Sequence, residues 1–301
     1  MLDDGRRWLA ATPERFDVIV SDLFIPWHAG TGRLYAREMY ATVAQRLAPG
    51  GLFAQWLPLY QLTRDEFETI ARTFLAVFPH ATLWRDDFYA DRPIVALVGQ
   101  LSPRPVTLEH IGDRLAALPA WARDPLLATP RAVAMLSMGD LAAAPELFAA
   151  APVNTDDRPV IEFRAPRLTR MSAVGDKDWF TGEALGAFYD DVAERLADAP
   201  DPLLPRTDEV RSARRAGTSL YHYAVAATRG DRLRAAALED EVRRLVPDVV
   251  QAADVAAPDA TVAAAERTLA TLEAREAALH ERLRQMERRL DTLGAPAEGE
   301  R

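Results

Sequence analysis

The chain has 301 residues, 45 acidic and 36 basic side chains, a formal net charge of −9 and no cysteine. This length predicts one large domain or two smaller ones. The lack of cysteine excludes disulfides, thiolate catalysis and cysteine-based metal sites. The acidic balance argues against a general nucleic-acid-binding protein, which needs a basic surface. Because no apolar stretch is long enough for a membrane span and no secretory leader is evident, we expect a cytoplasmic location.

Strand and helix signals alternate over the first hundred residues. Thr63 and Glu66 have the spacing of a helix capping box, and the Pro-Gly-Gly at 49–51 is typical of a helix end. We expect strands at 16–24, 52–59, 81–84 and 93–98, with helices at 34–47 and after residue 63. This order predicts an α/β fold, namely the later part of a Rossmann-like sheet of the methyltransferase type.

Ligands of such sheets bind beyond the carboxyl ends of the strands. Asp22 closes the first expected strand, Gln55 lies in the second, and Tyr89 lies in the polar loop before the last one. A carboxylate in the position of Asp22 could accept a proton from an attacking amine or hold a cationic substrate. The alternative is that Asp22 caps a helix or makes a loop hydrogen bond.

Residues 1–100 are expected to form this sheet, and composition divides the rest of the chain into three further segments. We expect residues 101–170 to form a helical extension with one short strand at 160–163. Residues 171–255 predict helices, including a hairpin that turns at Gly230-Asp231 and resembles a tetratricopeptide unit, although the missing aromatic positions favour a plain helical hairpin. Residues 256–301 carry a heptad pattern between Val262 and Leu293. That tail could form a homo-oligomer, pair within the chain, or stand as a single helix.

Other motifs carry weaker signals. Gly30-Thr31-Gly32 lacks the further glycine of a dinucleotide fingerprint, because position 35 is Tyr35, so we interpret it as a flexible loop over the crevice. His28 is a lone loop histidine, which is seldom a base or a ligand. The scattered histidines and paired aspartates predict no metal site. The Asp156 to Pro159 turn is interpreted as a structural cap.

Several segments together resemble the spermidine synthase (polyamine aminopropyltransferase) family. The similarity is greatest to a bacterial branch in which this domain follows a membrane transporter-like region. The resemblance covers roughly residues 1–167, and the segments that carry it are 3–9, 16–22, 22–32, 34–51, 55–62 and 154–166.

The resemblance implies transfer of an aminopropyl group from decarboxylated S-adenosylmethionine, the co-substrate, to the amine of putrescine or a similar polyamine. It implies no metal and no tightly bound cofactor. Asp22 matches the catalytic acid that takes the proton from the attacking amine, and burial of that carboxylate would suit the task. Asp4 and Gly5 match the pair that contacts the adenine, whereas Gln55 and Tyr89 match residues near the polyamine.

Two departures from the family pattern limit what the resemblance implies. The family has a second aspartate three residues after the catalytic acid, and Ile25 stands there, so one anionic contact for a dication is missing. The glycine-rich loop and the ribose-binding acid of the first strands are not found either. We therefore interpret the chain as the C-terminal half of the catalytic domain, with a truncated or miscalled gene product favoured over a remnant or a fold completed by a separate chain. The strand around Val18 would then lack a neighbour.

Two other functions fit the same sequence. A methyltransferase that uses S-adenosylmethionine would share the order of strands and helices, since fold alone does not fix function. A degenerate, non-catalytic domain that acts through its helical tail is the third hypothesis.

Overall fold

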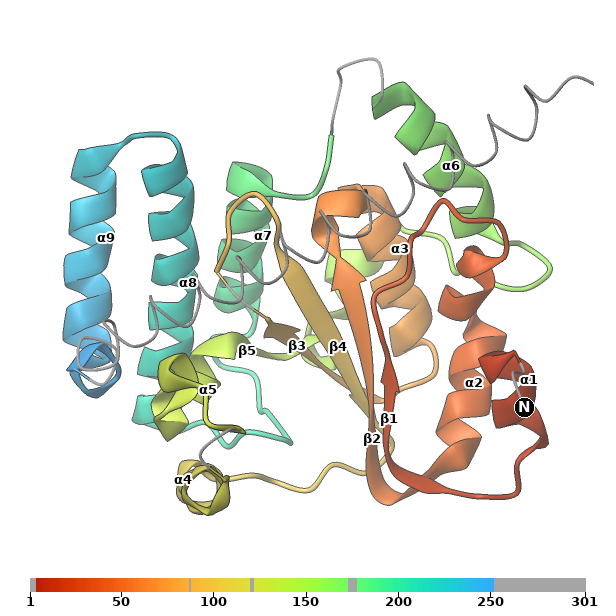
Figure 1. Ribbon diagram of the computed structural model, residues 1–301, viewed down its shortest axis with the longest axis horizontal. Coiled ribbons are helices and arrows are strands. Elements are labelled where there is room, and N and C mark those ends of the chain that lie inside the picture. Colours follow the sequence, from red (N-terminus) through yellow and green to blue (C-terminus); the bar gives the residue numbers. More distant parts are fainter. Residues whose placement is uncertain (1–3, 87, 120–121, 173–177, 252–301) are drawn as a thin grey trace, which may run out of the picture. The chain divides into compact units, whose positions relative to one another are not determined.

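The computed structural model describes residues 4–86, 88–119, 122–172 and 178–251 (Figure 1). The chain divides into two compact units after Val250, and nearly all described residues belong to the first unit. The heptad pattern expected at 256–301, with its proposed oligomer contact at 262–293, lies outside the described residues.

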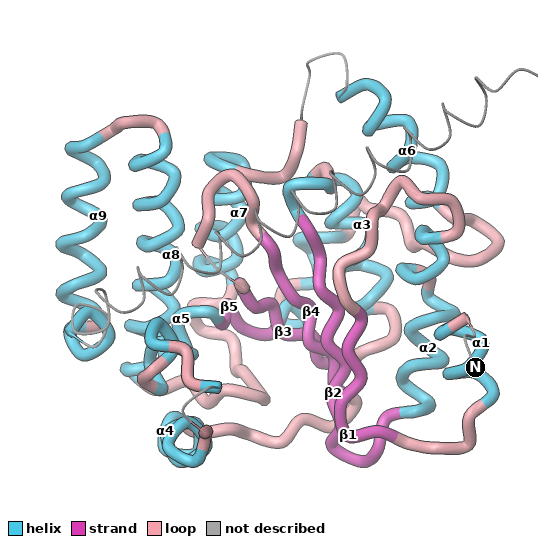
Figure 2. Tube along the Cα trace, in the orientation of Figure 1, coloured by secondary structure: helices cyan, strands magenta, loops and turns pink. Residues whose placement is uncertain are grey.

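The described residues contain one five-stranded sheet with the order β1-β2-β4-β3-β5 (Figure 2). Its strands are β1 (Phe16–Ser21), β2 (Leu47–Pro58), β3 (His80–Arg85), β4 (Ile94–Gln100) and β5 (Ser137–Asp140). β1 and β2 are parallel, whereas the β2–β4, β4–β3 and β3–β5 pairs are antiparallel. Helix α2 (Arg37–Arg46) connects β1 to β2, as a parallel pair requires. The α/β prediction is therefore confirmed, with β1–α2–β2 as the Rossmann-like unit.

The remaining helices include the expected capping box. The Thr63 side chain accepts from the Glu66 N–H, and Glu66 accepts from the Thr63 N–H, at the start of α3. Helices α8 and α9 lie side by side as a hairpin, and the turn between them contains Gly230 with a φ of 76° (Figure 1). The other described helices are α1 (Gly5–Ala11), α3 (Arg64–Leu75), α4 (Leu108–Ala117), α5 (Pro130–Leu136), α6 (Val160–Ser172), α7 (Gly182–Arg195), α8 (Asp208–Thr228) and α9 (Arg232–Leu245). None of them combines the length and the apolar character that a bilayer span needs.

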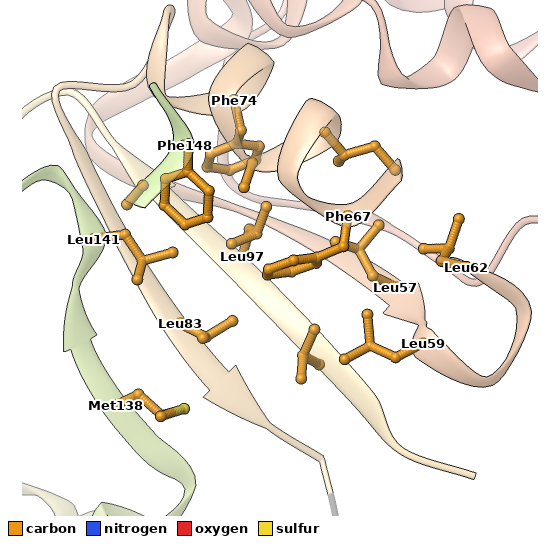
Figure 3. Packing of buried hydrophobic residues seen from close by; sticks show 14 of the residues in the cluster. Leu57, Leu59, Leu62, Phe67, Phe74, Leu83, Leu97, Met138, Leu141 and Phe148 are labelled. Carbon is orange, nitrogen blue, oxygen red and sulfur yellow. The ribbon is translucent and has the colours of Figure 1, made fainter. Parts of the chain in front are cut away.

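One face of the sheet carries the main hydrophobic core (Figure 3). Leu57, Leu83 and Leu97 come from three neighbouring strands and pack against Phe67 and Phe74 of α3. Each of these side chains is at most 1% exposed. Full burial of such a side chain contributes roughly 1.5–3 kcal/mol, so this layer fixes how the strand ends are presented.

The opposite face is left open at β1. Among the described residues β1 pairs only with β2, and Val18 and Val20 are 56% and 58% exposed. An apolar edge strand of this kind can pair with another chain. Within the described residues the strand around Val18 thus has β2 as its neighbour on one side and lacks a neighbour on the other.

Two local expectations were wrong. Residues 160–163 begin helix α6 and form no strand, because the Asn154 side chain accepts from the Ile161 N–H at 3.2 Å and supports the first helical turn. The short strand in the region 101–170 is instead β5, which pairs with β3. The expected helix end before residues 49–51 is confirmed, because α2 ends at Arg46, although these residues lie inside β2. The second correction concerns the loop after Asp22 and follows below.

Candidate functional site

The sheet brings two of the expected site residues and the loop of a third to one edge. Ser21 pairs with Gln55 across the parallel strands, so Asp22 follows directly at the carboxyl end of β1. Pro58 pairs with Ile94 in the antiparallel strand β4, so the connection between β3 and β4 lies at this same edge. That connection carries Tyr89. The topology thus gathers the residues that sequence reasoning placed near the amine.

Asp22 is exposed, and its Oδ1 accepts a hydrogen bond from the Leu23 N–H at 2.7 Å. This contact is the loop hydrogen bond that was the structural alternative for the residue. The burial expected for a catalytic carboxylate is not provided by the described residues. The second carboxylate oxygen remains open to a ligand, so the arrangement suits a proton acceptor or a partner for a cation.

Gln55 is fully buried in β2. Its Nε2 donates to the Trp56 carbonyl oxygen at 3.0 Å, while its Oε1 has no hydrogen-bond partner among the described residues. A buried acceptor without a donor costs about 1–3 kcal/mol. Burial of the Gln55 amide beside the strand end that carries Asp22 therefore lowers the stability of the folded chain.

Tyr89 is 67% exposed, whereas Phe24, two residues after Asp22, packs against the buried Tyr35. Phe24 contacts Tyr35 edge-on, with ring centroids 6.0 Å apart. His28 is exposed, and its N–H and carbonyl take part in turns with Ile25 and Thr31. In the loop after β1, Phe24 thus packs inward, whereas the polar residue His28 is exposed.

Asp4 and Gly5 occupy a different place. Asp4 is the N-cap of α1, where its side chain accepts from the N–H groups of Arg6 and Arg7 at 2.9 and 3.1 Å. Arg6 connects this helix to the far end of the loop after Asp22, because its Nη1 donates to the Arg33 carbonyl at 3.2 Å. Arg6 also forms an ion pair with Asp156. Helix α1, which Asp4 and Gly5 begin, is thus joined through Arg6 to Arg33 and Asp156.

The loop after Asp22 is held by a carboxylate that sequence reasoning missed. Glu162 at the start of α6 accepts from the N–H of Gly30 at 2.6 Å and from the N–H of Gly32 at 2.9 Å. The expectation of a flexible Gly30-Thr31-Gly32 loop was wrong for this reason. A Cβ on Gly32 would lie 2.6 Å from the Glu162 nitrogen, so glycine is needed for this close approach.

Asn154 also holds the loop that follows Asp22. Its side chain is fully buried, its Nδ2 donates to the Gly32 carbonyl at 2.9 Å, and its backbone N–H donates to the Thr73 hydroxyl at 2.8 Å. Asn154 and Glu162 both fall in the segment 154–166 that carried the family resemblance. That resemblance was the one signal in the sequence that could have pointed to them.

The described residues contain no cluster of three or more histidine, aspartate or glutamate side chains arranged to hold a metal ion. Of the groups expected near the amine, Asp22 and Tyr89 are exposed, whereas the amide of Gln55 is fully buried beside the strand end. Such a set can bind a cationic amine and accept a proton from it.

Comparisons with known proteins find similarity over part of the chain, although no family model matches it. The chain is 46% identical over 55 residues to the polyamine aminopropyltransferase of Mycobacterium tuberculosis, which covers 17% of this chain and 10% of that protein. It is 38% identical over 84 residues to the polyamine aminopropyltransferase of Aeropyrum pernix, with 27% and 26% coverage. The chain thus spans about a tenth to a quarter of the length of the curated relatives it matches.

A solved structure is also similar, namely a probable spermidine synthase from Corynebacterium glutamicum. The identity is 18%, the coverage is 52% of this chain and 53% of that one, and the TM-score is 0.35. A score at that level does not establish a shared fold. The names of these proteins say nothing of a transporter-like region, so that part of the resemblance stays a prediction. The sequence similarities relate part of this chain to the polyamine aminopropyltransferases.

Proposed function

We propose that this chain supplies the amine-binding part of an aminopropyl transfer site, with Asp22 as the proton acceptor. In this reaction the neutral amine nitrogen forms a bond to the aminopropyl carbon that is attached to the sulfonium sulfur of decarboxylated S-adenosylmethionine. The bond from that carbon to sulfur breaks and leaves methylthioadenosine, while the ammonium proton of the product passes to the Asp22 carboxylate. Atoms and charge balance without a metal or a redox partner.

The observation that carries the proposal is the pairing of Ser21 with Gln55, which sets Asp22 and Gln55 at one strand edge. The similarity to polyamine aminopropyltransferases supports the same chemistry. Gln55 Oε1 lacks a donor among the described residues, and an amine N–H would supply one. Tyr89, in the loop at this edge, is proposed to lie near the carbon chain of the amine, and Asp4 with Gly5 near the adenine.

Ile25 narrows the choice of amine. It is 40% exposed and stands where a second carboxylate would contact the far ammonium of a diamine. An apolar side chain there favours an acceptor with an uncharged or apolar far end over putrescine. The acceptor class is thus an amine with one ammonium group near Asp22.

The test is an aminopropyl transfer assay on the natural protein that contains this chain. Decarboxylated S-adenosylmethionine is supplied with putrescine or with butylamine, and the product is measured by mass spectrometry. The proposal predicts an aminopropylated amine and methylthioadenosine in equal amounts. Methylation by S-adenosylmethionine, with no aminopropyl transfer to either amine, would instead support the methyltransferase alternative.

A further inference from the structure

A cavity lies in the helical part of the fold. Its volume is about 550 Å³, and residues of α7, α8 and α9 line it together with the ends of β3 and β5. Its lining includes none of Asp22, Gln55 or Tyr89. Six arginines surround it: Arg85, Arg206, Arg211, Arg214, Arg215 and Arg234.

Five of these arginines are already neutralised by carboxylates. The pairs are Arg206 with Asp198, Arg211 with Asp208, Arg214 with Asp201, Arg215 with Glu241, and Arg234 with Glu183. Several of these carboxylates are exposed, so their pairs contribute little to stability. Four of these pairs have at least one half-exposed or exposed member, whereas the Arg214–Asp201 pair is largely buried, and all five arginines have their charge balanced.

Arg85 differs from the other five because it is 2% exposed and has no carboxylate partner among the described residues. Its Nη1 donates to the Met135 carbonyl and its Nη2 to the Thr218 hydroxyl, both at 2.8 Å. Its guanidinium carbon lies 4.7 Å from the centroid of the Tyr189 ring. Its Nε has no hydrogen-bond partner among the described residues. None of these partners carries a formal negative charge.

Burial, together with the positive charge of Arg214, lowers the pKa of Arg85 to about 10. The guanidinium therefore stays charged at neutral pH. A buried charge without a counter-charge is costly, so the fold retains Arg85 at an energetic disadvantage.

The packing around Arg85 is tight and specific. A Cβ on Gly217 of α8 would lie 2.1 Å from the Met135 carbonyl oxygen and 2.8 Å from Arg85 Nη1. Glycine at 217 thus allows α8 to approach the guanidinium closely enough for the Thr218 contact. Arg85 is held rigidly in the wall of the cavity and is not a mobile surface side chain.

Apart from the arginines, the lining combines apolar side chains with the carboxylates of Asp190 and Glu241, which are paired with His222 and Arg215. Met138, Leu196 and Leu238 line the cavity, along with the small side chains of Ala193 and Ala197. A guanidinium recognises the oxygens of phosphate and carboxylate groups. We propose that this cavity binds a small organic oxyanion, a phosphate ester or a carboxylate, whose charge faces Arg85 and whose apolar part contacts Leu196 and Leu238.

The experiment is calorimetric titration of the full chain with four probes: hexyl phosphate, hexanoate, inorganic phosphate and 1-hexanol. The proposal predicts that at least one of the two hexyl anions binds at least tenfold more tightly than inorganic phosphate and 1-hexanol. Tighter binding of hexyl phosphate assigns the phosphate class, and tighter binding of hexanoate assigns the carboxylate class. Binding of neither anion, or equal binding of 1-hexanol, would overturn the proposal.

Two variants and a control locate the site. Arg85→Met removes the charge and keeps an unbranched side chain, and it should weaken binding of the hexyl anion at least tenfold. Ala193→Trp keeps every charge and fills the cavity from an exposed position of α7, so it should abolish binding even where Arg85→Met fails to fold. Arg243→Gln removes an exposed arginine of α9 that pairs with Glu239 outside the cavity, and it should bind as the unmodified chain does. Unchanged binding in Ala193→Trp would place the ligand elsewhere.

Discussion

Glu162 holds Gly32 across 130 residues of sequence, with the Glu162 carboxylate accepting from the Gly32 N–H at 2.9 Å. The other oxygen of that carboxylate accepts from the Gly30 N–H. Because the loop that begins at Asp22 ends at these glycines, helix α6 fixes the far end of the segment that carries the proposed proton acceptor. The site therefore depends on a region far along the chain.

Replacing Glu162 tests this dependence. Hydrogen bonds to a charged group contribute about 1.5–3 kcal/mol, so Glu162→Ala should lower the free energy of unfolding by roughly that amount. Urea denaturation measures the change, and aminopropyl transfer should fall with it. Glu68→Ala is the matched control, because Glu68 pairs with Arg64 on the surface of α3. An equal effect of both variants would contradict a special role for Glu162.

Gln55 offers a test that separates binding from stability. Gln55→Leu removes a buried acceptor without a donor, so the free energy of unfolding should change by less than about 1 kcal/mol. If the amide contacts the amine, the KM for the amine should rise at least tenfold with a smaller change in kcat. Steady-state kinetics and urea denaturation measure the two effects. A large loss of stability with an unchanged KM would show that Gln55 is purely structural.

The buried carboxylate of Glu66 predicts a pH dependence of stability. Burial raises the pKa of Glu66 above its ordinary value of 4.5, and hydrogen bonds from Thr63 offset only part of this effect. The folded chain then holds the proton more tightly than the unfolded chain. The contribution of Glu66 to the free energy of unfolding is therefore fully present below pH 4.5. It is lost as the pH rises through the pKa that Glu66 has in the folded chain.

Glu66→Gln should remove this contribution. Urea denaturation at several pH values should show that the free energy of unfolding of the unmodified chain, relative to Glu66→Gln, falls from pH 4 towards pH 7. Glu68→Gln, which changes a half-buried carboxylate paired with Arg64 on the same helix, should leave the pH dependence as it is. A difference that grows in the opposite direction would contradict the assigned effect of burial.

The open edge of β1 predicts association. Val20→Lys places a charge on an exposed position, so it should change the free energy of unfolding by less than about 0.5 kcal/mol. It should also reduce self-association, because charged side chains block strand pairing at an edge. Sedimentation velocity measures the second effect. Ile19→Lys, on the inward side of the same strand, should unfold the chain instead.

The local part of the fold was predictable from sequence. Apolar runs and a capping box indicate β1, β3, β4 and α3, because these signals depend on residues close in sequence. Strand β5 was missed, since Ser137–Asp140 has no alternating apolar pattern and forms a strand through its pairing with β3. The segment 160–163 was mistaken for a strand, since Asn154 supports its first helical turn from six residues before it.

Some residues of the candidate site could likewise be predicted from local sequence, and others could not. Asp22 and Gln55 were identified because they lie at or near the ends of recognisable strands. The roles of Glu162 and Arg85 arise from contacts with distant segments, and no local pattern distinguishes them from other charged residues. The expected burial of Asp22 also depends on neighbours that its own sequence does not specify.

The central claim is that Asp22 accepts the proton in aminopropyl transfer. The measurement is the rate of aminopropylated amine formation by the natural protein that contains this chain, compared between Asp22→Asn and Asp17→Asn. Asp17 is an exposed aspartate on the same strand and serves as the control. We expect Asp22→Asn to lower kcat by about 10²–10⁴-fold and Asp17→Asn to leave it unchanged. Equal rates in both variants would contradict the assignment.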